Sequence, residues 1–192
     1  IDGNRFVQAA FKKGSSLAIV NKINKNCDKS KQVKVKNTLD FLTKCSSILR
    51  DNLKAKIISI TGSCGKTTLK DMIGTTLSKI SKTSYSPKSF NNKYGVPLSL
   101  FNLKNEDEFG VFEVGMDKKG EIDYLTKIIK PDVGIITNIS YAHSKNFKNI
   151  KQIANAKAEI MNNIKKDGVI ILNNDDKFYD YLKNVATKKN LK

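Results

Sequence analysis

The 192-residue sequence contains no long apolar run and is poor in arginine, histidine and cysteine. No stretch approaches the ~18 apolar residues that a membrane-spanning helix needs. The N-terminus also lacks the charged and then apolar pattern of a secretory signal. We therefore expect a cytoplasmic protein without membrane insertion. We also expect a monomer. The 39% hydrophobic fraction is typical of a globular protein with a real core.

Cysteine is scarce, and its spacing argues against two kinds of stabilising site. Cys27, Cys45 and Cys64 are odd in number and lack C-x-x-C spacing. This pattern disfavours both a disulfide framework and a zinc site. We expect three reduced thiols.

Arginine is almost absent from a strongly basic chain. The net charge is +17, but Arg5 and Arg50 are the only arginines among 35 basic residues, and the lysines are spread along the whole chain. The charge alone allows a basic nucleotide- or nucleic-acid-binding module. We favour a solvated lysine surface and no nucleic acid partner, because forked arginine contacts are the commoner device for phosphate and base recognition.

The first 53 residues indicate a short α/β segment followed by a connecting helix. We predict a helix at residues 5–12, a strand at 16–20 and a connecting helix at 37–53 whose apolar face includes Leu39, Leu42 and Leu49. The sequence starts at Ile1 in the middle of a pattern. We therefore expect the chain to be part of a longer protein.

After residue 54, apolar strands alternate with helices. This alternation predicts βαβ units and a parallel, doubly wound sheet with helices on both faces. In such sheets, ligands bind at the carboxyl ends of the strands. We predict strands at 57–60, 83–86, 111–114, 133–137 and 169–172, and helices at 66–80, 120–129 and 150–164.

The stretch "TGSCGKTT" follows the first of these strands and opens a helix, which is the context of a phosphate-binding loop. Lys66 would reach the β- and γ-phosphates, and the Thr67 hydroxyl would ligate magnesium. The longer form of the motif has glycine where this chain has Ile60, and an ordinary strand-to-helix turn is the alternative. The context favours nucleotide binding by Gly62, Ser63, Cys64, Gly65, Lys66, Thr67 and Thr68.

Two later strands also end in polar residues. Glu113 lies inside an apolar strand, where an unpaired carboxylate is costly, so it needs a magnesium ion or a lysine partner. His143 follows Thr137 and Asn138 just beyond another strand. We weigh it equally as a ligand and as an ordinary surface or core residue.

Lys157 lies on the apolar stripe of the 150–164 helix, between Ala154 and Met161. Burial lowers the pKa of an amine, and a neutral amine can react with carbon dioxide to give a carbamate, an anionic metal ligand. The alternative is a lysine that reaches solvent with only its stem buried.

The stretch "SPKSFNNKYGVPLSL" after the second strand contains Asn91 and Asn92 and a turn predicted at residues 95–97. A polar loop at this position is either a plain connection or a substrate clamp.

Four segments, in this order and spacing, resemble the Mur ligases: "ITGSCGKTT", "SFNNKYGVPLSL", "FEVGMDKKGEIDYLTKIIKPDVGIITNISYAH" and "IANAKAEI". The second segment is the most type-specific and points to the ligases that add D-alanyl-D-alanine to UDP-N-acetylmuramoyl-tripeptide. Another ligase of the superfamily, similar to folylpolyglutamate synthase, is the alternative. The resemblance implies part of an N-terminal UDP-substrate domain at residues 1–50 and an incomplete central ATP-binding domain at 51–192. It also implies a third domain elsewhere, so we expect this chain alone to be inactive.

The resemblance further implies residue roles and a two-step reaction. Lys66, Lys157 and His143 would be catalytic, with Lys157 carbamylated, and Thr67, Glu113, His143 and Lys157 would hold magnesium. Asn91 and Asn92 would face the muramoyl-peptide. The γ-phosphoryl of ATP would pass to the tripeptide carboxylate, and the amine of D-alanyl-D-alanine would attack the resulting acyl phosphate.

Overall fold

The computed structural model describes residues 2–141 and 146–192, and the chain divides into two units, Ile1–Cys45 and Ser46–Lys192. Helix α2 (Thr38–Asp51) crosses the division. Each unit has its own apolar core. In the described ranges, the helices are too short or too polar to span a bilayer.

The first unit is a small α/β fold around one parallel strand pair. Its core consists of Val7, Ala18 and Val20, and Ala18 lies opposite Gln32 in the strand pair. The helix predicted at residues 5–12 is present as η1 and α1, whereas β2 has no counterpart among the predictions. The elements are η1 (Gly3–Phe6), α1 (Val7–Lys12), β1 (Ala18–Val20), η2 (Lys29–Lys31) and β2 (Gln32–Lys34).

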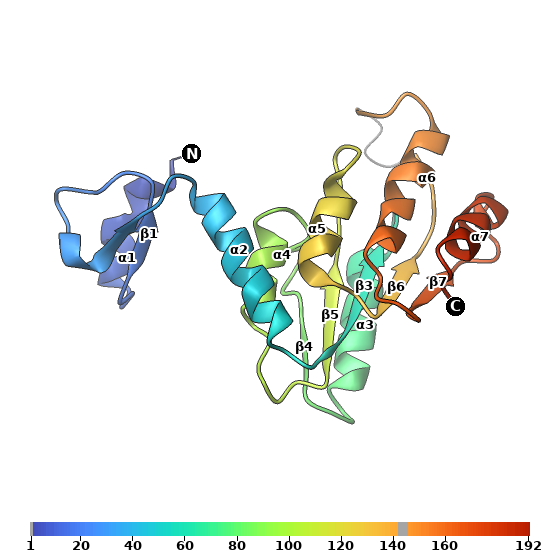
Figure 1. Ribbon diagram of the computed structural model, residues 1–192, viewed down its shortest axis with the longest axis horizontal. Helices are drawn as coiled ribbons and strands as arrows, with labels where there is room; N and C mark the ends of the chain where they lie inside the picture. The colour runs from blue at the N-terminus through green and yellow to red at the C-terminus, as the bar shows by residue number, and fades with distance from the viewer. Residues whose placement is uncertain (1, 142–145) are drawn as a thin grey trace. The chain divides into compact units, whose positions relative to one another are not determined.

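The second unit contains a five-stranded parallel sheet of order β4-β5-β3-β6-β7 (Figure 1). All five predicted strands are present, and the doubly wound fold class is confirmed. Central β3 pairs with β5 on one side and with β6 on the other, so that Ile58 lies between Val111 and Val133. The strands are β3 (Lys56–Thr61), β4 (Thr83–Tyr85), β5 (Phe109–Glu113), β6 (Val133–Ile136) and β7 (Val169–Leu172).

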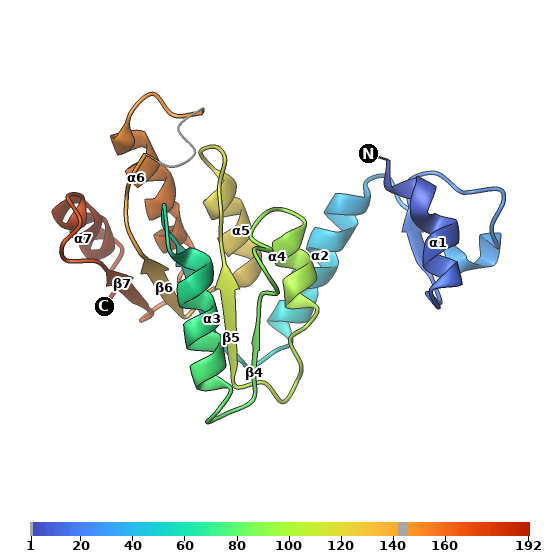
Figure 2. The same ribbon diagram turned by 180° about the vertical axis from the view of Figure 1, so that it is seen from behind.

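Helices cover both faces of this sheet. Figure 2 shows α3 on the near face, and Figure 1 shows α5 and α6 on the other. Ile57 and Ile60 of β3 are fully buried in different apolar clusters, as expected for side chains that alternate between faces. Burial of each contributes about 1.5–3 kcal/mol. The helices are α3 (Lys66–Leu77), α4 (Gly95–Leu100), α5 (Glu121–Ile129), α6 (Ile150–Ala158), η4 (Glu159–Asn162) and α7 (Tyr179–Lys188).

Helix α4 corrects the prediction of a turn at residues 95–97. Pro97 lies in the first turn of the helix, where a missing backbone N–H removes no helical hydrogen bond. Val96, Pro97 and Leu100 are buried, so tertiary packing stabilises a helix of only six residues.

Arg50 fastens the C-terminal end of α2, which belongs to the second unit, to the rest of that unit. Its side chain is 3% exposed, and it donates to the carbonyl oxygens of Ile129 (2.8 Å) and Leu53 (2.9 Å). The Asp132 carboxylate lies 3.7 Å away. Burial lowers the pKa of the guanidinium, an effect that the Asp132 charge opposes.

The topology places a crevice at the carboxyl end of β3. From β3 the chain passes to β4 and β5 on one side of the sheet and later to β6 and β7 on the other. Such a switch point leaves the strand ends open to a ligand.

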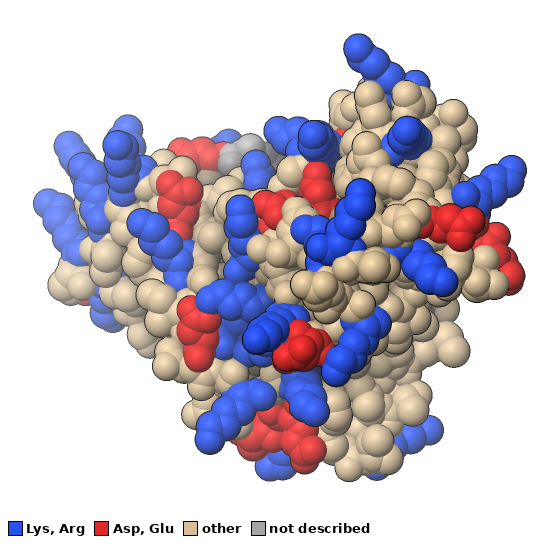
Figure 3. Space-filling model, turned by 45° about the vertical axis from the view of Figure 1, so that its right-hand side comes forward, with Lys and Arg blue, Asp and Glu red and all other residues tan. Residues whose placement is uncertain are grey.

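On the face in Figure 3, lysine and arginine side chains are scattered among acidic ones, which supports a solvated lysine surface.

Candidate functional site

The loop Gly62–Gly65 has the backbone geometry of an anion cradle. Gly62 and Gly65 have φ values of +148° and +78°, which favour glycine. A Cβ on Gly62 would lie 1.8 Å from Thr137 Oγ1, so no side chain fits there. Helix α3 begins at Lys66 without a side-chain cap at Gly65. Its first N–H groups are therefore available to an anion.

The carboxyl end of β6 holds this loop in place. Asn138 Oδ1 accepts from the backbone N–H groups of Ser63 (3.2 Å) and Cys64 (3.0 Å). Thr137 Oγ1 donates to the Cys64 carbonyl oxygen at 2.6 Å. Ser63 Oγ donates to the carbonyl of Ser140 and accepts from its N–H. The strand-end residues singled out in the sequence therefore support the loop, a role that the sequence pattern does not specify.

Thr67 and Glu113 meet beside the loop. Glu113 is 1% exposed, and Thr67 Oγ1 donates to Glu113 Oε2 at 2.6 Å. Asn91 Nδ2 donates to the other carboxylate oxygen, also at 2.6 Å. Within the described ranges no lysine forms an ion pair with Glu113, so the lysine alternative is not what the fold shows. A hydroxyl and a carboxylate are oxygen ligands of the kind that magnesium prefers.

Lys157 is 2% exposed, which confirms its predicted burial on α6. Burial, and secondarily the nearby charge of Lys66, lowers the pKa of Lys157 from 10.5 to about 7, whereas Cys64 opposes the shift. A substantial neutral fraction of this amine is therefore present near pH 7. Both Lys66 and Lys157 line the same cleft.

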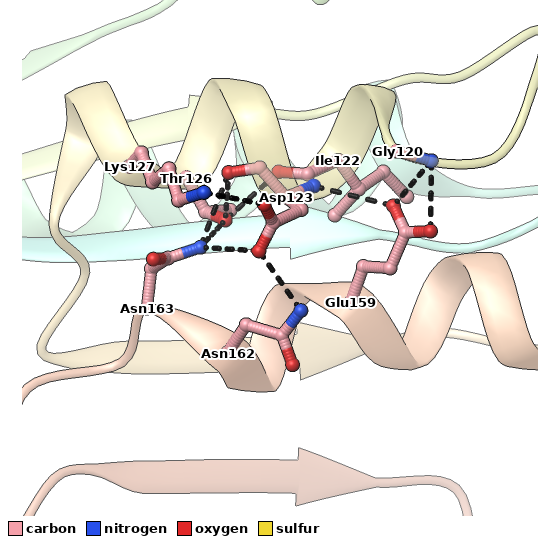
Figure 4. A network of polar contacts seen from close by, with 8 residues as sticks. All are labelled: Gly120, Ile122, Asp123, Thr126, Lys127, Glu159, Asn162 and Asn163. Carbon is pink, nitrogen blue, oxygen red and sulfur yellow. Dashed lines mark hydrogen bonds and ion pairs between the residues drawn. The ribbon is translucent and has the colours of Figure 1, made fainter.

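A polar network fixes the helix that carries Lys157 (Figure 4). The Glu159 carboxylate, two residues further along, accepts from the N–H groups of Gly120 (2.8 and 3.0 Å) and Asp123 (3.3 Å) at the start of α5. Burial raises the pKa of this carboxyl group, although these hydrogen bonds act in the opposite direction. Asn162 and Asn163 donate to Asp123 Oδ1. The contacts join the end of α6 to the first turn of α5.

The cleft has a volume of about 620 Å³ and opens at the carboxyl ends of the strands. Lys66, Lys157, Asn91 and Asn92 line it together with residues 115–121. Asn92 Oδ1 also accepts from the N–H of Gly95, so this side chain caps α4. Five of the predicted site residues therefore line one cavity: Gly62, Lys66, Asn91, Asn92 and Lys157.

Two predicted residues are not part of this constellation. Thr68 is exposed in the first turn of α3. His143 lies outside the described residues. In the described part of the chain, histidine, cysteine, aspartate and glutamate form no cluster of three that would hold a metal by themselves.

Asp176 supports the site but was missed by the sequence reasoning. Its carboxylate accepts from the N–H of Ile139 at 2.6 Å, next to the Asn138 that holds the phosphate loop. It also accepts from the N–H of Phe178 at 2.8 Å. The available signal was the pair of aspartates just after the predicted strand at 169–172.

The fold and the loop define a P-loop α/β domain. The chain matches the Mur ligase middle domain over residues 60–192, and it belongs to this family. It is 37% identical over 190 residues to the UDP-N-acetylmuramoyl-tripeptide--D-alanyl-D-alanine ligase of Rickettsia prowazekii. The matched region covers 99% of this chain and 42% of that protein.

Solved structures of MurF agree with this assignment. The Acinetobacter baumannii enzyme superposes with a TM-score of 0.88 at 35% identity, over 98% of this chain and 41% of that one. MurF from Thermotoga maritima, solved in complex with ADP, has a TM-score of 0.82 at 29% identity, over 96% and 42% of the two chains. The chain thus spans about two fifths of the length of the relatives it matches.

Proposed function

We propose that this chain is the nucleotide-handling part of an ATP-dependent amide ligase that joins D-alanyl-D-alanine to UDP-N-acetylmuramoyl-tripeptide. The observation that carries the proposal is that Lys66 and buried Lys157 line one cleft. The hydrogen-bonded pair of Thr67 and Glu113 adjoins this cleft through Asn91, which lines it and donates to Glu113. The names of the similar ligases from Rickettsia prowazekii and Acinetobacter baumannii supply the reaction.

On this proposal, residues 51–192 form the ATP-binding domain, and residues 1–50 belong to the domain that binds the UDP-linked substrate. Lys66 and the N–H groups at the start of α3 would bind the nucleotide phosphates. A lysine and a helix N-terminus both favour anions, and the two positive-φ glycines leave room for close approach. The similarity to a MurF solved with ADP supports ATP as the nucleotide.

Thr67 and Glu113 fit a magnesium ion, because they present a hydroxyl and a buried carboxylate 2.6 Å apart. When bound, magnesium would neutralise phosphoryl charge during transfer. Asn91 orients the Glu113 carboxylate through its amide. His143 is proposed as a further magnesium ligand because the sequence resembles the Mur ligases.

Lys157 is proposed to carry a carbamate. Its neutral amine would add to carbon dioxide, forming a nitrogen–carbon bond and releasing one proton to solvent. The product is an anionic oxygen ligand suited to magnesium. The lowered pKa of Lys157, about 7, supports this step because only the neutral amine reacts.

The substrates are proposed to meet over this cleft. Transfer of the γ-phosphoryl group to the tripeptide carboxylate would give an acyl phosphate and release ADP. The amine of D-alanyl-D-alanine would then attack the carbonyl carbon, forming the amide bond and releasing inorganic phosphate and a proton. Asn91 and Asn92 would face the muramoyl-peptide, a role that their position in the lining of the cleft supports. Lys66 would stabilise negative charge on the transferring group.

The test is product formation by the full-length protein. With UDP-N-acetylmuramoyl-tripeptide, D-alanyl-D-alanine, ATP and magnesium, we expect mass spectrometry to detect the UDP-linked pentapeptide and a matching amount of ADP, and the Lys66→Ala variant to form neither. Activity on a folate substrate instead of UDP-N-acetylmuramoyl-tripeptide would reject the proposed substrate. Product formation without ATP would reject the proposed chemistry.

A further inference from the structure

Lys70 has one of the largest fully buried side chains in the described part of the protein, with 1% exposure. It lies in α3 one turn after Lys66. Its Nζ donates to the carbonyl oxygens of Ser86 (2.8 Å) and Lys88 (2.9 Å) and pairs with Asp71 at 2.7 Å. A buried ammonium is tolerated only when such partners replace water. The same contacts hold the backbone of the loop at residues 86–92, which we call the amide loop.

The amide loop carries side chains into the proposed magnesium site. Ser89 Oγ lies 3.3 Å from Thr67 Oγ1. Asn91 Nδ2 donates to Glu113 Oε1 at 2.6 Å, and the Asn91 carbonyl accepts from the N–H of Gly115. Because Lys70 and Thr67 lie on the same helix, the bonds from Lys70 fix the amide loop relative to the Thr67 hydroxyl.

The backbone conformation of Lys88 and the packing around Tyr85 also support the attachment of the amide loop to α3. Lys88 has a φ of +49°, a left-handed conformation that is unfavourable for a residue with a Cβ, and its carbonyl is one that Lys70 binds. The Lys70 ammonium also lies 5.8 Å from the ring centroid of Tyr85 at the end of β4. A Cβ on Gly74 would come within 2.6 Å of that ring, so α3 and β4 are in close contact.

We propose that Lys70 is a positioning residue for magnesium-nucleotide binding, which it supports by fixing the amide loop so that Asn91 and Ser89 orient Glu113 and Thr67. The proposal rests on the proposed function, because it presumes that Thr67 and Glu113 hold magnesium. Lys70 itself touches neither nucleotide nor metal. Its role differs from that of Lys66, which would contact phosphate directly.

The main test measures how much magnesium improves ATP binding. ATP is titrated into the protein by calorimetry with magnesium and with chelator, and the ratio of the two dissociation constants is the magnesium gain. In Lys70→Met we expect the gain to fall roughly tenfold or more, because a small displacement of positioning groups is costly. Affinity for metal-free ATP should stay within about twofold, since the Lys66 contacts do not require the amide loop.

A second measurement follows the loop itself. In Lys70→Met, hydrogen exchange at the amides of Phe90 and Asn91 should accelerate, while exchange at Ile60 in the central strand stays unchanged. A lysine that merely stabilises the fold would accelerate exchange throughout or leave the magnesium gain intact. Should Lys70→Met fail to fold, Lys70→Gln keeps an amide nitrogen with two N–H donors but removes the charge, and it is subjected to both measurements.

Asp71→Asn is the matched control, because it removes only the ion pair to Lys70 from a side chain that is 52% exposed. Its magnesium gain should match the wild-type value. Combined with Asn91→Ala, Lys70→Met should add little further loss, since both act through the same loop. A wild-type gain that persists in the Lys70 variant would overturn this proposal alone, whereas a wild-type protein without any magnesium gain would overturn the proposed function as well.

Discussion

Replacement of Lys157 by methionine should change how stability depends on pH. Folding lowers the pKa of this amine from 10.5 to about 7, mainly through burial. Between these two values the unfolded chain binds a proton that the folded chain does not. Stability therefore rises with pH across this window, because ∂ΔG/∂pH is positive when the unfolded state binds more protons.

The size of the effect follows from the same two values. At pH 7 the amine is half protonated in the folded state, and the lowered pKa reduces the free energy of unfolding by about 4 kcal/mol. At pH 10 this reduction falls to about 1 kcal/mol. Wild-type protein should thus gain about 3 kcal/mol more than Lys157→Met between pH 7 and pH 10. Urea unfolding in metal-free, carbonate-free buffer measures this difference.

Lys151→Met is the control for this experiment, because Lys151 is exposed on the same helix. Its stability should depend on pH as that of the wild type does. Because both variants contain the same other lysines and tyrosines, the contributions of those groups cancel when the two variants are compared. If Lys157→Met and Lys151→Met gave parallel curves, the argument that Lys157 is desolvated would be wrong.

Three further variants test the loop and the carbamate. Lys66→Ala should abolish magnesium-ATP binding, and unchanged affinity by calorimetry would reject the phosphate-loop assignment. Gly62→Ala should weaken ATP binding and lower the melting temperature, because its Cβ would lie 1.8 Å from Thr137 Oγ1; a wild-type melting curve would contradict this. In the full-length protein, Lys157→Ala should lower ligase activity strongly, and short carboxylic acids should partly restore it. Near-normal activity of Lys157→Met would reject the carbamate.

Local sequence patterns were sufficient for the sheet and for Lys157. Strands β3, β6 and β7 are short runs rich in isoleucine or valine, and an apolar run of this kind is typical of a strand in a parallel sheet. Lys157 was found because it interrupts an apolar stripe with helical period. The rule that ligands bind at the carboxyl ends of parallel strands drew attention to Glu113, whereas the resemblance to the Mur ligases grouped it with Thr67.

The supporting contacts could not be predicted because they join distant residues without a pattern. Lys70 binds backbone carbonyls 16 and 18 residues away, and any residue type supplies a carbonyl. Asn138 likewise accepts from loop N–H groups more than 70 residues away. Helix α4 was missed because Gly95 and Pro97 resemble a turn, whereas tertiary burial favours the helix.

The central claim is that Thr67 and Glu113 hold magnesium beside a bound nucleotide, and Glu113→Gln tests it most directly. The change keeps the shape of the side chain and removes its charge. Calorimetric titration of ATP should show that magnesium tightens binding to the wild type, and that this gain falls at least roughly tenfold in Glu113→Gln. Glu108→Gln, exposed just before the same strand, should retain the gain. If Glu113→Gln kept the full magnesium gain, or magnesium had no effect on the wild type, the account of this site would be contradicted.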